Sequence, residues 1–316
     1  MRLDTYQARA KSTDHTSNKF VTSINRGAVV ALLGLAGELG TLCATYKKYL
    51  RDGKNYKLKD SHIREELGDI LWYLAIVADG FNLSLDEVAE TNLKKTAGRW
   101  KDVVTKAKRF DDDMPPSQRL PRKFEIVLTQ NRIDGRMKAV MFMGDQLLGD
   151  PLTDNADEAD GYRFHDAFHI AFLTTLGWSP VLRKLMGRKR RTNKTKDETE
   201  DGGRAIVIEE GIAALVFEYG SSNGLSSGKH ILDDELLITI QQMTRRLEVK
   251  DQSGYEWQKA ILTGWKTFSK LKKARGGRII CDLDKQSVRV LKLRERDINK
   301  ARRLLKDAKS MKTNLN

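Results

Sequence analysis

The sequence predicts a mainly α-helical protein, with an all-α bundle in its N-terminal third and an α+β region behind it. Through the first hundred residues, apolar side chains recur every three or four positions, the spacing of one face of a helix. The segment 111–118, DDDMPPSQ, combines charge with two prolines and ends this pattern. Beyond it, apolar and polar residues alternate as they do in strands. We therefore expect one domain at 1–110, a second at 111–293 and a basic tail at 294–316.

The N-terminal bundle is expected to contain one short helix and three longer ones. The short helix covers 4–12. The first long helix runs over 27–53 and ends at a glycine, which favours a helix C-terminus. The second covers 63–79. The third begins at Ser84, because Ser-Leu-Asp-Glu has the sequence of a capping box.

Acidic residues interrupt the apolar faces of two of these helices. Glu38 lies on the shoulder of the first apolar stripe, and Glu66 and Asp69 lie on the inner side of the second. A carboxylate in apolar surroundings is unfavourable unless a cation or hydrogen bonds face it. Three of them indicate a divalent metal held by oxygen ligands, with Mg²⁺ the leading candidate. The alternative is a structural ion network with the lysines at 47–48 or with Lys95.

The second domain is expected to combine helices with two short β-hairpins. One hairpin pairs 123–129 with 138–143, around an Asp-Gly turn. The other pairs 278–282 with 287–291. The expected helices of this region cover 162–176, 181–186, 205–219, 233–246 and 254–272.

Composition favours anionic partners and a reducing compartment. The chain has 316 residues and a formal net charge of +14, which suits nucleotides, nucleic acid or acidic proteins. It has only two cysteines, so a disulfide framework is not expected. No apolar signal core precedes the first helix, and no run of 18 apolar residues occurs. We therefore expect a cytoplasmic protein that does not span a membrane.

Three motifs together resemble one known family. They are GLAGE at 34–38, EELGDILWYL at 65–74 and SLDEVAETNLKK at 84–95. In identity, helix order and spacing they are similar to the MazG-type all-α nucleoside triphosphate pyrophosphohydrolases. The resemblance covers the N-terminal third and leaves the C-terminal extension unassigned. It implies a MazG-like helical bundle, assembled as a homodimer or a larger homo-oligomer.

The resemblance also implies an activity and its residues. Family members hydrolyse nucleoside triphosphates, NTP or dNTP, to monophosphate and pyrophosphate, with Mg²⁺ and sometimes Mn²⁺. Water attacks the α-phosphorus. By position, the implied metal ligands are Glu38, Glu66 and Asp69. The catalytic set adds Glu65, whose family role is less certain, and the implied substrate-binding residues on the third helix are Asn92, Lys95 and Arg99.

One position departs from the family pattern. The first motif usually carries a second glutamate three residues after the first, and here Thr41 takes that place. A hydroxyl is a weak Mg²⁺ ligand, so one metal remains compatible with the sequence more readily than two or three. The main alternative to an enzyme is therefore a catalytically degenerate nucleotide sensor or regulatory protein.

A second group of polar residues lies in the extension. His165 and His169 are four residues apart, a spacing that places both imidazoles on one face of a helix. Glu209 and Glu210 lie in an apolar helix further along. Two interpretations compete. One is a second divalent-metal or phosphate site; the other is a core network in which a protonated histidine or Arg204 pairs with the glutamates.

Two basic segments suggest a third class of function, nucleic-acid binding. Arg188–Lys196 is strongly basic, as is the tail, and both could contact the phosphates of a nucleic acid. No aromatic residues interleave with the run, so a surface that stacks single-stranded bases is not expected. A solvated loop is the favoured interpretation, and nucleic acid is an alternative partner to the nucleoside triphosphate.

Overall fold

The computed structural model describes the backbone of residues 1–14, 26–100, 109–225 and 232–313. Side chains at 26, 94–95, 97–100 and 311–313 are outside the described set. Two compact units divide the chain, Met1–Ala97 and Gly98–Asn316. The mainly α fold class is confirmed, because helices dominate both units and the described strands form one small sheet.

The N-terminal unit contains the four helices that the sequence predicts. They are α1 (Leu3–Ser12), α2 (Arg26–Asp52), α3 (Asp60–Gly80) and α4 (Leu85–Trp100). A short 3₁₀ turn, η1 (Gly53–Asn55), follows α2. The hairpin of α2 and α3 is the main contact of the unit, and α1 packs on α3. Gly34 permits close packing of this hairpin, since a Cβ there would collide with the ring of Tyr73.

The start of α4 is capped as predicted, although its second partner differs. Ser84 Oγ accepts from the backbone N–H of Glu87 at 3.2 Å. Asp4 of α1, rather than Glu87, completes the arrangement, because its Oδ1 accepts from Ser84 Oγ at 2.7 Å and from the N–H of Asp86 at 3.0 Å. The cap therefore also attaches α1 to α4.

The apolar face of α2 is largely uncovered within the unit. The buried core is small and consists mostly of alanines, with Ile76 and Leu85 as its large members. Leu39 and Tyr46, which recur at helical spacing along α2, are 52% and 51% exposed. Further exposed apolar residues on α2 are Leu32, Leu33, Tyr49 and Leu50. Much of this stripe therefore has no partner among the described residues of the unit.

Helix α2 also has the length and apolarity of a membrane span, by composition alone, over residues 27–55. Its C-terminal part carries Lys47, Lys48 and Arg51, and the helix packs along α3. The expectation that the chain does not span a membrane remains a prediction.

The two predicted hairpins join into one antiparallel sheet in the C-terminal unit. Strands β1 (Lys123–Ile133) and β2 (Arg136–Met143) form the first hairpin, and β4 (Gly276–Asp282) and β5 (Ser287–Leu291) form the second. β1 pairs with β4, and the two-residue β3 (Gln146–Leu147) extends the edge, giving the order β3-β2-β1-β4-β5.

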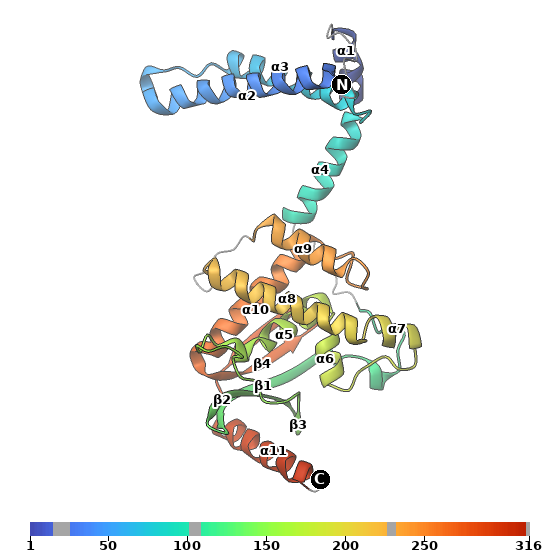
Figure 1. Cartoon of the computed structure of the whole chain (residues 1–316), viewed down its shortest axis with the longest axis vertical. Coiled ribbons are helices and arrows are strands. Elements are labelled where there is room, and N and C mark those ends of the chain that lie inside the picture. Colours follow the sequence, from blue (N-terminus) through green and yellow to red (C-terminus); the bar gives the residue numbers. More distant parts are fainter. Residues whose placement is uncertain (15–25, 101–108, 226–231, 314–316) are drawn as a thin grey trace. The chain divides into compact units, whose positions relative to one another are not determined.

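Helices cover both faces of this sheet. Figure 1 shows α5 (Asp166–Leu176), α8 (Gly203–Ser222) and α10 (Gly254–Ala274) on one side. On the other side lies α11 (Glu295–Thr313), the predicted basic tail. The remaining elements are η2 (Pro116–Gln118), η3 (Tyr162–Phe164), α6 (Pro180–Leu185), α7 (Lys194–Thr199) and α9 (Asp234–Thr244).

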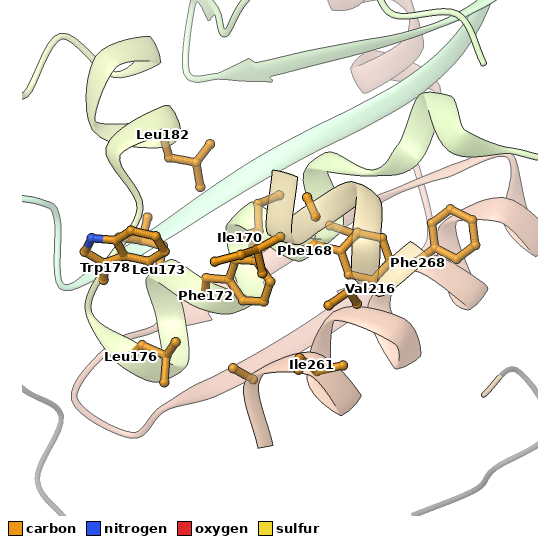
Figure 2. Packing of buried hydrophobic residues seen from close by; sticks show 14 of the residues in the cluster. Phe168, Ile170, Phe172, Leu173, Leu176, Trp178, Leu182, Val216, Ile261 and Phe268 are labelled. Carbon is orange, nitrogen blue, oxygen red and sulfur yellow. The ribbon is translucent and has the colours of Figure 1, made fainter. Parts of the chain in front are cut away.

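Alternation along β1 divides the core of the unit. Ile126 and Leu128 face the large cluster under the helices, while Val127 packs with Ala301 and Leu304 of α11. Figure 2 shows the centre of the large cluster, where apolar side chains of α5 meet others from α8 and α10. This packing fixes α5, the helix that begins beside His165.

Close approach of α10 to α5 depends on a glycine. A Cβ at Gly264 would lie 2.7 Å from Cδ1 of Phe168, so any larger residue would push the helices apart. Every residue of α5 is buried. Its polar residues Asp166 and His169 therefore require partners within the protein.

Candidate functional site

Glu66 is the most deeply placed of the three predicted metal ligands. It lies on the second turn of α3 and is 6% exposed. Its Oε2 is buried and has no hydrogen-bond partner in the described structure. A buried carboxylate oxygen without a donor is unfavourable by about 1–3 kcal/mol or more. A cation bound at this oxygen would remove that cost, and a hard oxygen donor suits Mg²⁺.

The other two predicted ligands are nearer the surface. Glu38 is half-buried on α2, and Asp69 is exposed on α3, one turn after Glu66. These three do not form a converging set of ligand atoms in the described structure. Like charges repel, so separated carboxylates are the expected arrangement when only protein groups face one another. Their assignment as a shared site remains a prediction.

The alternative of a lysine-paired ion network finds no support. Within the described residues, no ion pair joins Glu38, Glu66 or Asp69 to Lys47 or Lys48. The side chain of Lys95 lies outside the described residues. Histidine is the only charged partner that the described structure gives Glu66.

This partner, His62, was not identified from the sequence as a candidate site residue. Its Nε2 lies 3.5 Å from Oε1 of Glu66 and 3.4 Å from Oγ1 of Thr45, which is buried. Its Nδ1 lies 3.9 Å from Oε2 of the exposed Glu65. The spacing of three and four residues along α3 could have identified it. His62 therefore joins the candidate site as the group nearest Glu66.

The third-helix residues and Thr41 complete the predicted set. Asn92 is exposed on α4, while the side chains of Lys95 and Arg99 are outside the described residues. Thr41 is exposed, and its Oγ1 donates to the carbonyl of Gly37 at 3.3 Å. The hydroxyl that replaces the family glutamate is therefore hydrogen-bonded within its own helix.

The second predicted group does come together, in the C-terminal unit. His165 is the residue that precedes α5, and His169 lies one turn into it. Both face α8, which carries Glu209 and Glu210. The predicted helix over 162–176 begins later than expected, because Tyr162–Phe164 forms a 3₁₀ turn.

Glu209 is the completely buried member of this group. Its Oε1 accepts from Nδ1 of His169 at 2.9 Å and from Oγ of Ser179 at 2.6 Å. Its Oε2 accepts from the N–H of Val181 at 2.8 Å, in the first turn of α6. Burial alone would lower the pKa of His169, but the neighbouring Glu209 and Glu210 outweigh it and raise that pKa to about 10.

One residue of this group, Ser179, could not be found from spacing alone, whereas Asp166 lies within the predicted segment from His165 to His169. Ser179 is 30 residues from Glu209 and also caps α6 by accepting from the N–H of Leu182. Asp166 lies between the histidines and is 5% exposed. Arg204, proposed as a partner of the glutamates, is exposed and forms no described pair with them.

Several basic side chains of the run 188–196 form ion pairs or hydrogen bonds within the protein. Arg190 is 1% exposed and pairs with Asp201 at 2.7 Å and with Glu248 at 2.7 Å. Lys189 pairs with Asp197 and Lys196 with Asp113. Arg188 donates to the carbonyls of Pro116 and Ser117. Part of the predicted solvated loop is helical, as α7.

Comparison with known families decides the classification of the chain. Residues 105–294, more than half of the chain, match the MazG C-terminal domain. The chain belongs to the MazG family. Residues 32–104 match the MazG nucleotide pyrophosphohydrolase domain. The resemblance seen in the N-terminal motifs is therefore confirmed, and the extension left unassigned is the MazG C-terminal domain.

A phage relative extends the comparison for the MazG domain. The "Gene 37 protein" of Mycobacterium phage L5 is 31% identical over 101 residues, which is 31% of this chain and 89% of the relative. No solved structure matches the chain significantly. The MazG domain supports nucleoside triphosphate pyrophosphohydrolase activity in general.

Proposed function

We propose that this MazG-family protein hydrolyses a nucleoside triphosphate, NTP or dNTP, to the monophosphate and pyrophosphate with Mg²⁺ bound. The observation that carries the proposal is Glu66, whose buried Oε2 lacks a partner in a MazG pyrophosphohydrolase domain. Glu38, Glu66 and Asp69 would hold the ion, and Mn²⁺ is a chemically similar substitute. When bound, Mg²⁺ would neutralise phosphate charge and lower the pKa of a bound water.

The chain's own residues have separate tasks in this reaction. A water oxygen attacks the α-phosphorus, and the bond between that phosphorus and the bridging oxygen to the β-phosphate breaks. His62, 3.5 Å from Glu66, is placed to take up the proton released by the water or to orient Glu66. Asn92 of α4, with Lys95 and Arg99, would bind the phosphates.

Pyrophosphate release over a panel of NTPs and dNTPs, with Mg²⁺ or Mn²⁺, tests the proposal. Glu66→Gln should lower the rate by at least about 100-fold, the size of effect expected when one electrostatic group is lost from an active site. Glu87→Gln, an exposed carboxylate of α4, is the matched control. No release with any substrate would favour the nucleotide sensor instead, and equal release by Glu66→Gln would refute the assignment of Glu66 to the site.

We also propose that the N-terminal unit functions as a homodimer in the cytoplasm. The uncovered stripe on α2 supports a second copy as its partner, because several leucines and tyrosines there are exposed. An open groove of about 810 Å³ is lined by Leu42, Tyr46, Ile63 and Leu67, among others, and adds to this apolar surface. Burial of such surface stabilises association by roughly 25 cal/mol per Å² before the cost of association is subtracted.

A further inference from the structure

The two histidines beside α5 have the same orientation of their ring nitrogens. His165 Nδ1 lies 3.0 Å from the carbonyl oxygen of Tyr162, and His169 Nδ1 lies 2.9 Å from Oε1 of Glu209. A carbonyl oxygen and a carboxylate only accept, so each Nδ1 carries the proton. In the neutral rings, Nε2 therefore presents its lone pair. This is the arrangement in which protein histidines bind metals.

Both Nε2 atoms face the same carboxylate oxygen. Oε2 of Glu210 lies 3.7 Å from Nε2 of His165 and 3.4 Å from Nε2 of His169. A charge-assisted hydrogen bond would be about 2.7–2.9 Å long. Two ligands held 2.0–2.1 Å from a tetrahedral metal ion lie about 3.3 Å apart. The observed separations exceed a hydrogen bond and are close to the spacing of two metal ligands.

Buried polar groups of this cluster that lack hydrogen-bond partners also indicate a set of metal ligands. His169 is completely buried, and its Nε2 has no hydrogen-bond partner in the described structure. Asp166 is 5% exposed, and no hydrogen bond to its carboxylate occurs among the described residues. Ligand atoms of His165, Asp166 and His169 lie within 4.8 Å of one another. With both rings neutral, two lone pairs and two carboxylates would meet here without enough protons to satisfy them.

We propose that His165, His169, Asp166 and Glu210 bind one divalent transition-metal ion in the MazG C-terminal domain. Two imidazole nitrogens favour Zn²⁺, Mn²⁺, Fe²⁺, Co²⁺ or Ni²⁺ over Mg²⁺ and Ca²⁺, which prefer ligand sets made of oxygen. Glu209 has a positioning role, because its oxygens already accept from His169, Ser179 and Val181. The Glu210 side chain is 45% exposed, so this edge of the site is open to solvent.

The competing interpretation is a structural pair between imidazolium and carboxylate. In that case both nitrogens of His169 carry protons, Glu210 is a counterion, and no metal binds. The two interpretations differ in one measurable property, the affinity of the folded protein for a transition metal through Glu210 and His165.

Titration of chelator-treated, full-length protein with Co²⁺ separates these interpretations, because visible absorption of bound Co²⁺ reports mixed nitrogen and oxygen ligands. Every protein also carries Glu66→Gln, which removes a predicted ligand of the N-terminal site. His165→Gln and Glu210→Gln are the test variants; the Glu210 side chain is 45% exposed, the His165 side chain is 10% exposed, and glutamine keeps a polar side chain at both positions. Glu235→Gln, an exposed carboxylate of α9, is the control.

We expect the parent and Glu235→Gln to bind one Co²⁺ per chain, displaced by Zn²⁺. His165→Gln and Glu210→Gln should each lower the affinity by at least about tenfold. Circular dichroism confirms that each variant is folded. Absence of binding by the folded parent, or unchanged affinity in either test variant, would overturn the proposal. Pyrophosphate release does not enter this test, so its result is independent of the proposed activity of the N-terminal unit.

Discussion

His169 Nδ1 donates to Oε1 of Glu209 across 2.9 Å, and neither side chain is exposed to solvent. This contact joins α5 to α8. Through its other oxygen, Glu209 also accepts from the first turn of α6. One carboxylate therefore links three helices of the C-terminal unit, and its loss should be felt in the stability of the whole unit.

Replacement of Glu209 should destabilise the protein strongly. Glu209→Ala leaves His169 and the hydroxyl of Ser179 without their buried acceptor. Breaking a buried pair by removal of one partner costs about 3–5 kcal/mol. Urea denaturation with chelator present measures the free energy of unfolding. Glu218→Ala, an exposed position on the same helix, is the control, and an equal loss for both variants would contradict the assigned role.

A carboxylate at position 41 should strengthen the N-terminal metal site. Thr41→Glu restores the residue that the family usually has, one turn after Glu38, where the threonine hydroxyl now bonds to its own helix. We expect tighter Mg²⁺ or Mn²⁺ binding and faster pyrophosphate release, measured by calorimetry and by a phosphate-coupled assay. Thr41→Gln matches the size without the charge. Equal effects of Glu and Gln would show that charge at this position does not act on the metal.

The exposed stripe of α2 gives a test of association. Leu39 is 52% exposed within the chain, so Leu39→Glu should leave the isolated helix hairpin intact. In a homodimer the same change would bury a charge at the interface and shift the mass measured by light scattering toward the monomer. Lys48→Glu, on the same helix but polar already, should change the mass much less. A monomeric parent protein at micromolar concentration would disprove the dimer.

Acid should weaken one buried network of the C-terminal unit. Burial opposes ionisation of Asp111, but a backbone N–H from Leu120 and the guanidinium of Arg183 outweigh it, so the pKa of Asp111 is lowered. A lowered pKa means that its stabilising contribution is complete above its ordinary value of 3.8 and is lost as pH falls through the folded value.

Asp111→Asn should therefore destabilise the protein at neutral pH, and the difference from the parent should shrink as pH falls below about 4. Guanidinium denaturation at several pH values measures it. Asp112→Asn is the control, because Asp112 is 56% exposed although it also contacts Arg122. A pH-independent difference for Asp111→Asn would refute the assignment.

Local sequence patterns predicted the helices and hairpins better than they predicted the tertiary contacts of these elements. The start of α4 was evident at Ser84, yet the residue that completes its cap, Asp4, is 80 positions away. The two hairpins were visible from alternation and an Asp-Gly turn, but nothing local indicated that β1 pairs with β4. Short α7 was missed because its six residues are too few to show a helical period.

The same distinction applies to the candidate sites. Spacing alone placed His165 and His169 on one face, and apolar surroundings marked Glu66 as buried. The acceptors that orient the two imidazoles, the carbonyl of Tyr162 and the carboxylate of Glu209, depend on tertiary structure. Glu38 and Asp69 do not converge on Glu66 among the described residues, and their shared metal site remains a prediction.

Pairing of β1 with β4 affects the order in which a newly made chain can fold. Glu125 and Arg278, which pair across these strands, are 153 residues apart in sequence, whereas α2 and α3 are joined by a short connection. Long-range pairing slows folding, so the N-terminal hairpin should form while the C-terminal unit is still emerging from the ribosome. Its uncovered apolar helix would then be available to a neighbouring nascent chain first, and assembly of the proposed homodimer would precede completion of the sheet.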